Sequence, residues 1–341
     1  MEKDQYGQLS YLVSIAAVGF IISTLGLGRT IIVYGAKKEN VFSPAYALAV
    51  ISSLITSIAA YVIFQNIAVS FFILGQIIYL LNDADLLSKS RYTQFSKYML
   101  LRSILSVIFA IILYQILGIN GIILGFAFAS LLGIRGFYIF VRTKKINISS
   151  LKPKLGFMIY NWVSAIAGIL FFSGDKLLIG TLFGFSILGN YQFAFQFFTL
   201  LLALPYTIFT YFMPQEAQGT RNKKLKIFSV GLACILALLS VLVMPYMIKI
   251  FFPNYHESLL PMQIMSTGII PFTILSIQES QFLGKERSKV VLVGSFLTVG
   301  SYFSLIVLLG AVGGLIGLIS AFLISAIIRI IFNIIVIRLN M

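Results

Sequence analysis

Residues 103–133 read SILSVIFAIILYQILGINGIILGFAFASLLG, two apolar runs joined by the short turn 118–120. Neither run carries a charged residue. With its flanking residues, each run reaches the roughly 20 residues that a helix needs to cross the hydrocarbon core of a bilayer. The sequence therefore predicts two membrane helices, over 97–117 and 121–141, joined by a short loop.

The same alternation of long apolar runs and short breaks continues through the whole chain. Hydrophobic residues make up 59% of the sequence and charged residues 10%, against about 25% charged residues in a typical soluble domain. This pattern predicts an all-α polytopic membrane protein with about eleven transmembrane helices. The other nine helices are expected over 9–28, 44–63, 66–87, 157–180, 187–212, 225–250, 258–283, 289–309 and 313–337.

Positive charge sets the expected orientation, because cytoplasmic loops retain Lys and Arg. Of the 25 Lys and Arg residues, only Lys3, Lys176 and Lys249 fall outside every second connection. We therefore expect a multi-pass protein of the cell (cytoplasmic or inner) membrane, with the first residues outside and the C-terminus in the cytoplasm. The net charge of +15 then faces anionic membrane lipids, and no nucleic-acid partner is expected.

Two segments of the chain resemble each other. Residues 117–125, LGINGIILG, align with residues 309–317, LGAVGGLIG, and the same register pairs Ser96-Lys97 with Ser288-Lys289. We interpret this as an internal duplication with two pseudo-symmetric lobes in the same orientation, related by an axis along the membrane normal. The predicted lobes are 1–142, with five helices, and 157–341, with six, joined by a cytoplasmic linker over 143–156.

The sequence after the linker resembles a known family. Residues 175–184, DKLLIGTLFG, followed by 188–194, LGNYQFA, resemble the signature between the seventh and eighth helices of polysaccharide exporters. Residues 5–10, QYGQLS, and 25–28, LGLG, are similar to the region around that family's second helix. The chain thus resembles the O-antigen-type branch of the multidrug, oligosaccharidyl-lipid and polysaccharide exporter superfamily.

The resemblance implies two six-helix lobes around a central cavity. The chain is then expected to lack the first of the usual twelve helices, which would precede residue 1. An upstream start codon, a truncated gene or a protein that works with eleven helices would each explain this, and we favour an incomplete first lobe.

The resemblance also implies a function, that of a flippase rather than an enzyme. Such a protein moves a polyprenyl-pyrophosphate-linked oligosaccharide from the inner to the outer leaflet by alternating access, for lipopolysaccharide (O-antigen) or other surface-glycan assembly. Glycosyltransferases or a glycan polymerase are the expected protein partners. The alternatives are a cation-coupled small-molecule exporter, an inactive truncated remnant, and a membrane-embedded glycosyltransferase or polymerase, for which no outer loop is long enough.

Cationic side chains near the inner helix ends are candidates for binding an anionic head group. They are Arg29, Arg102 and Arg135. Arginine can hold phosphate oxygens with two parallel hydrogen bonds. The alternative for each is that its side chain extends to the interface and contacts anionic lipid.

Acidic residues inside membrane spans are costly, which makes them candidates for function. Asp175 and Lys176 are both candidates for the substrate cavity, where Asp175 would bind a cation or a sugar hydroxyl. The alternatives are a structural pair between the two and a Lys176 side chain that extends to the interface. Asp83 and Asp85 are expected either to couple transport to an ion or to offset Lys89 and Arg91.

Glu279, together with Gln278, is a candidate for the inner mouth of the cavity. No metal and no cofactor is expected, because Cys234 and His256 are the single Cys and the single His, and no cluster has metal-ligand spacing.

Overall fold

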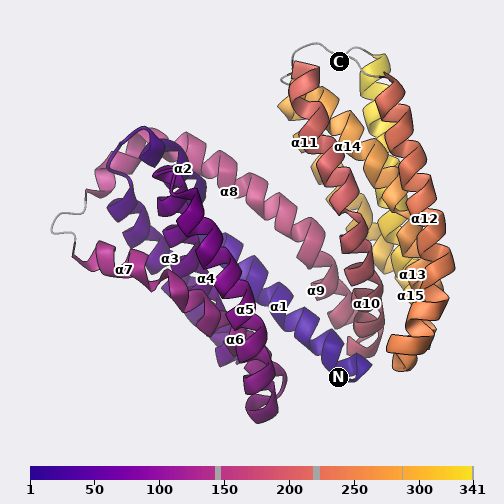
Figure 1. The fold of residues 1–341 in the computed structure, drawn as a ribbon, viewed down its shortest axis with the longest axis horizontal. Coiled ribbons are helices and arrows are strands. Elements are labelled where there is room, and N and C mark those ends of the chain that lie inside the picture. The colour runs from indigo at the N-terminus through magenta and orange to yellow at the C-terminus, as the bar shows by residue number, and fades with distance from the viewer. Residues whose placement is uncertain (143–146, 218–222, 286, 340–341) are drawn as a thin grey trace. The chain divides into compact units, whose positions relative to one another are not determined.

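The computed structural model describes residues 1–142, 147–217, 223–285 and 287–339. Lys144, Lys145 and Arg221, which the sequence places in basic inner loops, lie outside these residues. The described residues form helices and no strand (Figure 1). Contacts group the chain into two units, which we call the N-terminal unit (12–174) and the C-terminal unit (Met1–Tyr11 and Asp175–Met341).

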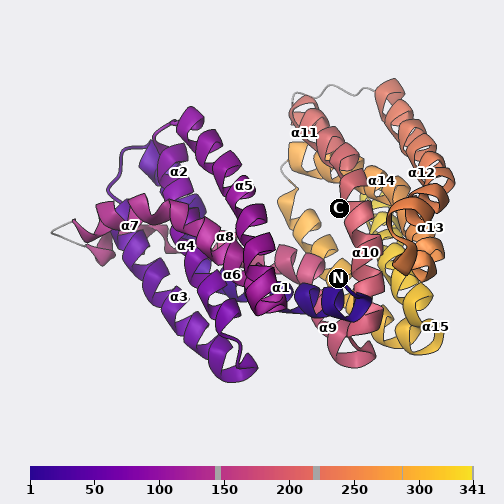
Figure 2. The ribbon, with the colours of Figure 1, turned by 60° about the horizontal axis from the view of Figure 1, so that its bottom comes forward.

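The N-terminal unit is built around α4, which contacts α2, α3, α6 and α7 and is buried over much of its length. In contrast, α5 has no buried residue. It packs mainly along α6, and the two helices lie next to each other in Figures 1 and 2. The elements of this unit are α1 (Lys3–Thr24), α2 (Leu27–Ala36), α3 (Phe42–Phe64), α4 (Ile67–Ser88), α5 (Tyr92–Leu117), α6 (Ile119–Ser130), η1 (Leu131–Gly133), α7 (Ile134–Val141), η2 (Ile148–Lys154), α8 (Leu155–Ile169) and the π-helix η3 (Leu170–Gly174).

The C-terminal unit has an aromatic core. Tyr191, Phe198, Tyr302 and Phe322 are fully buried, and the ring of Phe322 packs edge-on against those of Phe198 and Tyr302. The elements are the first turns of α1, followed by α9 (Asp175–Phe183), α10 (Phe185–Leu201), α11 (Ala203–Ala217), α12 (Lys223–Phe251), η4 (Pro253–Ser258), α13 (Leu259–Thr267), α14 (Ile269–Gly284) and α15 (Ser288–Arg338).

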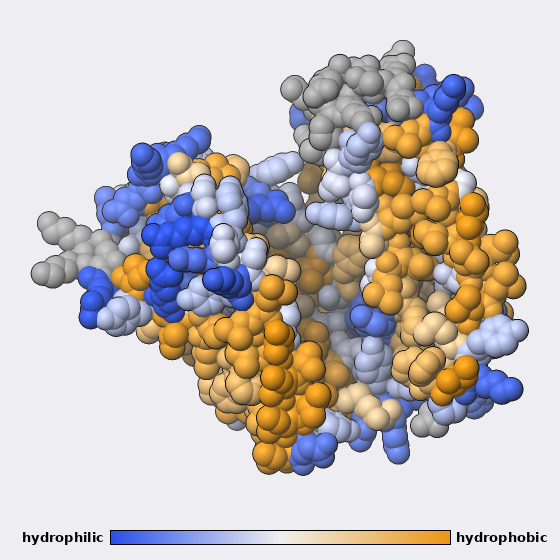
Figure 3. Space-filling model, viewed as in Figure 1, coloured by the Kyte–Doolittle hydropathy of each residue, from blue (hydrophilic) through white to orange (hydrophobic). Residues whose placement is uncertain are grey.

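The described helices confirm an all-α protein that crosses the membrane many times. Ten of them are long and apolar enough to span a bilayer, and the last, Lys289–Arg338, turns at Gly314 and so covers two of the eleven predicted helices. Large apolar side chains lie exposed along α5 and α12, including Ile104, Ile116, Leu238 and Tyr246. Figure 3 shows apolar surface over both helices. Such a surface is stable against lipid and not against water.

The first predicted helix, 9–28, differs from the observed one at both ends. Helix α1 begins at Lys3, where Gly7 lets the backbone approach α10, since a Cβ there would lie 1.9 Å from the carbonyl oxygen of Phe185. The helix then breaks before α2 at Gly26, which has a positive φ of 71° and lies against the carbonyl of Met158 on α8. These close approaches could not be predicted from apolar periodicity.

The first turns of α1 therefore belong to one contact-based unit and the rest of α1 to the other. Helix α8 belongs to the N-terminal unit, where the Trp162 indole nitrogen donates a hydrogen bond to the carbonyl of Ile22 at 3.0 Å. The two units are defined by contacts between residues, whereas the predicted lobes 1–142 and 157–341 are defined by the repeat in the sequence. The lobe boundaries therefore stay a prediction.

The internal repeat is visible in the backbone, but the predicted register is wrong by one helical turn. Gly118 (φ 57°, ψ −138°) has its conformational counterpart in Gly314 (φ 52°, ψ −133°), not in Gly310. A Cβ on Gly121 would lie 2.0 Å from the carbonyl oxygen of Leu113, and one on Gly317 would lie 1.9 Å from that of Leu309. Both pairs fit the register in which Gly118 matches Gly314.

The helix starts agree with the corrected register. Arg91 and Arg287 precede α5 and α15 with nearly the same backbone angles (φ −86°, ψ 55° and φ −86°, ψ 48°). Ser288 therefore matches Tyr92, and the predicted pairing of Ser96 with Ser288 is wrong. Glycines recur about every turn between 310 and 317, so a shift by one turn still aligns glycine with glycine. Sequence alone could not choose between the registers.

We predict that Gly317→Ala destabilises the protein and that Gly313→Ala, four residues earlier, does not. The Cβ at residue 317 would meet a backbone carbonyl, whereas nothing lies within 4 Å of the one at residue 313. We expect a loss of about 1–3 kcal/mol for the first variant, as for other overpacked sites, and a change within about 0.5 kcal/mol for the second. Thermal unfolding of the purified proteins measures both, and equal melting temperatures would contradict the close approach at Gly317.

Candidate substrate site

Helices α4 and α5 of the N-terminal unit line a cavity of about 570 Å³. Gln76, Tyr79 and Asp83 lie on one face of α4 because they are three and four residues apart. Helix α5 packs mainly along α6, where Gly121 and Gly125 let the two backbones approach closely, and it contacts α4 much less. The other lining residues are Phe95, Met99, Arg102, Ser103 and Ser106 of α5, with Val13, Phe72 and Phe126.

A chain of hydrogen bonds holds Arg102 in this cavity. Its Nη2 donates to Oε1 of Gln76 at 2.7 Å, and Nε2 of Gln76 donates to Oγ of Ser130 at 3.2 Å. The guanidinium also lies over the ring of Tyr79, 4.2 Å from its centroid. Among the described residues this is the one hydrogen bond that Arg102 makes, so most of its five N–H donors are available to a ligand.

Asp83 lies in the same cavity and keeps an unsatisfied carboxylate oxygen. Its buried Oδ1 has no hydrogen-bond partner, and no cationic group of the described residues lies within 4.0 Å of the carboxylate. The buried hydroxyl of Tyr79 interacts with Asp83 and Arg102 but makes no hydrogen bond of good geometry to the described residues. Buried polar atoms of this kind are normally satisfied by water or a ligand.

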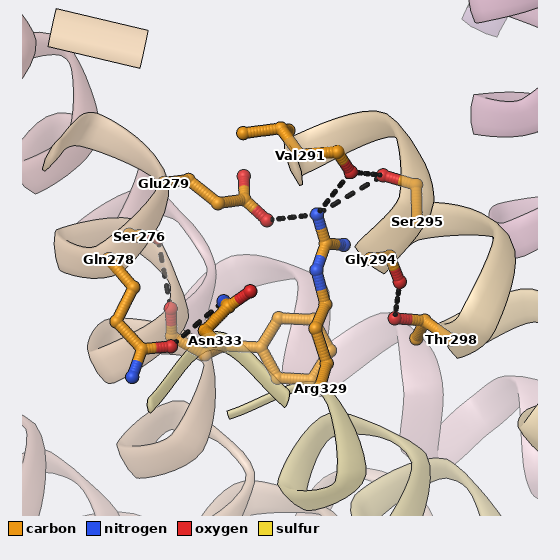
Figure 4. Close-up of polar contacts among 10 residues, drawn as sticks. Ser276, Gln278, Glu279, Val291, Gly294, Ser295, Thr298, Arg329 and Asn333 are labelled. Atoms are coloured by element: carbon orange, nitrogen blue, oxygen red, sulfur yellow. Dashed lines mark hydrogen bonds and ion pairs between the residues drawn. The ribbon is translucent and has the colours of Figure 1, made fainter. Parts of the chain in front are cut away.

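Gln278 and Glu279 lie in the C-terminal unit, where side chains of α15 satisfy them (Figure 4). Nδ2 of Asn333 donates to Oε1 of Gln278 at 2.9 Å. Arg329 forms an ion pair with Glu279 at 2.6 Å and also donates to Oγ of Ser295 at 3.1 Å. In the corrected register Glu279 matches Asp83, so the two repeats place a carboxylate at the same position, paired in one unit and unpaired in the other.

Asp175 and Lys176 form a buried pair within the C-terminal unit. The carboxylate of Asp175 is 0% exposed and lies 3.2 Å from Nζ of Lys176. It also accepts hydrogen bonds from the hydroxyls of Tyr191 at 2.8 Å and Tyr302 at 3.1 Å. This geometry favours the structural pair among the two predicted roles, because the carboxylate is already neutralised and hydrogen-bonded.

The remaining candidates lie elsewhere in the N-terminal unit. Arg29, on α2, is exposed and donates to Oδ1 of Asn161 at 3.0 Å. Arg135, on α7, is exposed beside a separate apolar groove. Asp85 forms an ion pair with Lys89 at 2.6 Å, as expected of a residue that offsets basic charge. The three predicted arginines are therefore not brought together in one described cavity.

Sequence reasoning missed several residues of these sites. Gln76 and Tyr79 form a polar stripe with Asp83 inside an apolar helix, and that spacing was a signal that could have found them. Arg329 was also missed. Its partner Glu279 lies on another helix, and no local pattern connects the two.

Many apolar spans with a polar cavity inside one repeat define a multi-pass membrane protein of the transporter class. The sequence model described as "Polysaccharide biosynthesis protein" matches residues 1–256. The chain belongs to this family of polysaccharide biosynthesis proteins. No curated protein matches the chain significantly.

Solved structures show the same fold at low sequence identity. Lipid II flippase MurJ in an inward closed conformation is 13% identical, with a TM-score of 0.71 over 98% of this chain and 85% of that one. An inward-facing multidrug-resistance MATE transporter of the MOP superfamily is 13% identical, with a TM-score of 0.69 over 100% and 95%. A MOP transporter from Pyrococcus furiosus is 13% identical, with a TM-score of 0.56 over 97% and 87%. The chain therefore has the MOP-transporter fold.

We predict that Glu279→Gln is more destabilising than the double variant Glu279→Gln/Arg329→Gln. The single change leaves the guanidinium of Arg329 without its counter-ion in a largely buried position, at a cost of about 2–4 kcal/mol. Removing both charges recovers much of this loss. Denaturation in detergent measures the difference, and a double variant less stable than the single one would contradict the pairing.

Proposed function

We propose that this protein is a flippase that moves a polyprenyl-pyrophosphate-linked oligosaccharide from the inner to the outer leaflet. The observation that carries the proposal is the guanidinium of Arg102, held by Gln76 and Tyr79 inside a cavity of about 570 Å³. A fixed guanidinium with free donors suits phosphate oxygens. Membership of the polysaccharide biosynthesis family, together with the fold shared with a lipid II flippase, supports this choice of cargo.

The position of Arg102 fits a head group that must cross hydrocarbon. Arg102 lies ten residues after the start of α5, or about 15 Å along a helix that rises 1.5 Å per residue. A pyrophosphate there would exchange water for the donors of Arg102, while the hydroxyls of Ser103 and Ser106 supply partners for sugar groups. The polyprenyl tail stays in lipid, so only the polar head needs a protected path.

The direction of transport follows from the charge asymmetry of the loops. With the N-terminus outside and the C-terminus in the cytoplasm of the cell membrane, α5 starts on the cytoplasmic side, where the lipid-linked glycan is assembled. Glycosyltransferases would supply this cargo and a polymerase would consume it. The flippase itself makes and breaks no covalent bond.

A small-molecule exporter is the second candidate, and Asp83 is the observation that favours it. An acidic group in an apolar cavity suits a lipophilic cation, and MATE transporters share the fold. Arg102 opposes this function because it would repel such a substrate within the same cavity.

We predict that Arg102→Gln strongly lowers transport. Arg102→Lys should lower it less, because the charge remains and only the planar fork is lost. The measurement is surface glycan in a flippase-deficient strain that expresses each variant. Losing charged hydrogen bonds worth about 1.5–3 kcal/mol corresponds to a loss of roughly ten-fold to a hundred-fold. Arg142→Gln is the matched control, since Arg142 also stacks on a tyrosine, at 4.3 Å, but is exposed and outside the cavity.

Full activity of Arg102→Gln at equal membrane abundance would contradict the phosphate-binding role. The exporter function replaces the flippase under two conditions. Neither the wild-type protein nor any variant restores surface glycan, and expression of the wild-type protein, but not of an Asp83→Asn variant, lowers the accumulation of a lipophilic cation dye.

A further inference from the structure

In the C-terminal unit, an arginine side chain occupies the position that matches the cavity of the N-terminal unit. There, Nη2 of Arg329 lies 2.6 Å from Glu279, 3.1 Å from Oγ of Ser295 and 3.4 Å from the carbonyl oxygen of Val291 (Figure 4). A positively charged group thus fits between a carboxylate of α14 and the first turns of α15.

The corrected register carries this arrangement into the N-terminal unit. Glu279, Ser295 and Val291 match Asp83, Met99 and Phe95 respectively, and all three of these residues line the cavity. Arg329 itself matches Gly133, which has no side chain and whose backbone lies against Tyr79. The N-terminal unit therefore has a cavity beside a carboxylate where the C-terminal unit has its own guanidinium.

The charges of the cavity indicate what kind of ligand fits it. Its lining contains one carboxylate, Asp83, and one guanidinium, Arg102, and the two are more than 4.0 Å apart because Gln76 and Tyr79 hold the guanidinium. Asp83 weakens the binding of a ligand that carries only negative charge, and Arg102 weakens that of a ligand that carries only positive charge. A ligand with one negative and one positive group would satisfy both side chains at once.

We propose that the cavity recognises a zwitterionic group, with a phosphate at Arg102 and a primary ammonium at Asp83. An amino sugar next to the phosphate of the lipid-linked glycan has this chemistry, and the cavity volume is in the range of small-molecule sites. The inference rests on the proposed function and narrows its substrate class: the cargo carries a free amine close to its phosphate.

The test measures binding to the full chain in lipid nanodiscs by calorimetry. Glucosamine 1-phosphate and N-acetylglucosamine 1-phosphate share the phosphate and the hydroxyls, and only the first has an ammonium. We expect the wild-type protein to bind the amine form about ten-fold more tightly, which corresponds to about 1.4 kcal/mol. O-phosphoethanolamine, which has both charges and no sugar, is the third ligand.

Asp83→Asn should remove the preference for the amine and leave the affinity for the N-acetyl form, which also shows that the variant is folded. Asp83→Asn also controls for the larger size of the acetyl group. If the wild-type protein preferred the amine form only because it is smaller, Asp83→Asn would show the same preference. Asp85→Asn is the matched control: it removes the same charge from the same helix, where Asp85 pairs with Lys89 outside the cavity. The control should keep the ten-fold preference.

Equal binding of both sugar phosphates by the wild-type protein, or a preference that survives in Asp83→Asn, overturns the zwitterion inference and leaves the flippase proposal intact. If neither sugar phosphate binds, or if Arg102→Gln binds both as well as wild type, the phosphate site and the inference fail together. Binding of phosphoethanolamine that equals the amino sugar and depends on Asp83 supports the zwitterionic site and assigns it to a phospholipid head group. Much weaker binding of phosphoethanolamine supports the site and assigns it to the glycan.

Discussion

Close approach of two helices at residues without side chains is the constraint on which this structure depends. In each repeat one helix turns at a glycine with positive φ, Gly118 or Gly314, into the next helix. The next glycine along, Gly121 or Gly317, approaches the preceding backbone closely. Inside a membrane the backbone cannot gain stability by leaving water, so tight van der Waals packing at small residues holds helices together. This contact fixes α5 to α6 and thereby keeps the cavity between α5 and α4.

The two repeats use the same backbone for different purposes. In the C-terminal unit, Arg329 pairs with Glu279. Asp175 pairs with Lys176 and accepts hydrogen bonds from two tyrosines, so these interior polar groups have partners within the unit. In the N-terminal unit, Arg102 is held by neutral partners and Asp83 keeps an unsatisfied oxygen. A carboxylate without an ion-pair contact is costly in a membrane span, even with an arginine in the same cavity. Asp83 lacks such a contact, whereas the matching residue Glu279 has one. This difference is the reason for assigning ligand binding to the N-terminal unit.

Hydropathy was enough to predict the helical class, the number of spans and most of their ends, because these depend on local composition. The repeat register was wrong, because glycines recur in 310–317 at intervals that fit two alignments. The role of Asp175 could not be chosen from sequence, since its partner Tyr302 lies 127 residues away. Arg102 was identified from its charge alone, while its isolation from Arg29 and Arg135 depends on how α2, α5 and α7 pack.

The central claim, that matching positions are open to a ligand in one repeat and filled in the other, can be tested with two engineered cysteines. Met99→Cys lines the cavity, and Ser295→Cys occupies the matching position beside Arg329. Each is placed in a Cys234→Ala background, because Cys234 is the single native cysteine, and is treated in membranes with a membrane-impermeant thiol reagent. Rapid labelling at residue 99, with little at residue 295, is the predicted result. Equal labelling at both positions, or faster labelling at residue 295, would contradict it.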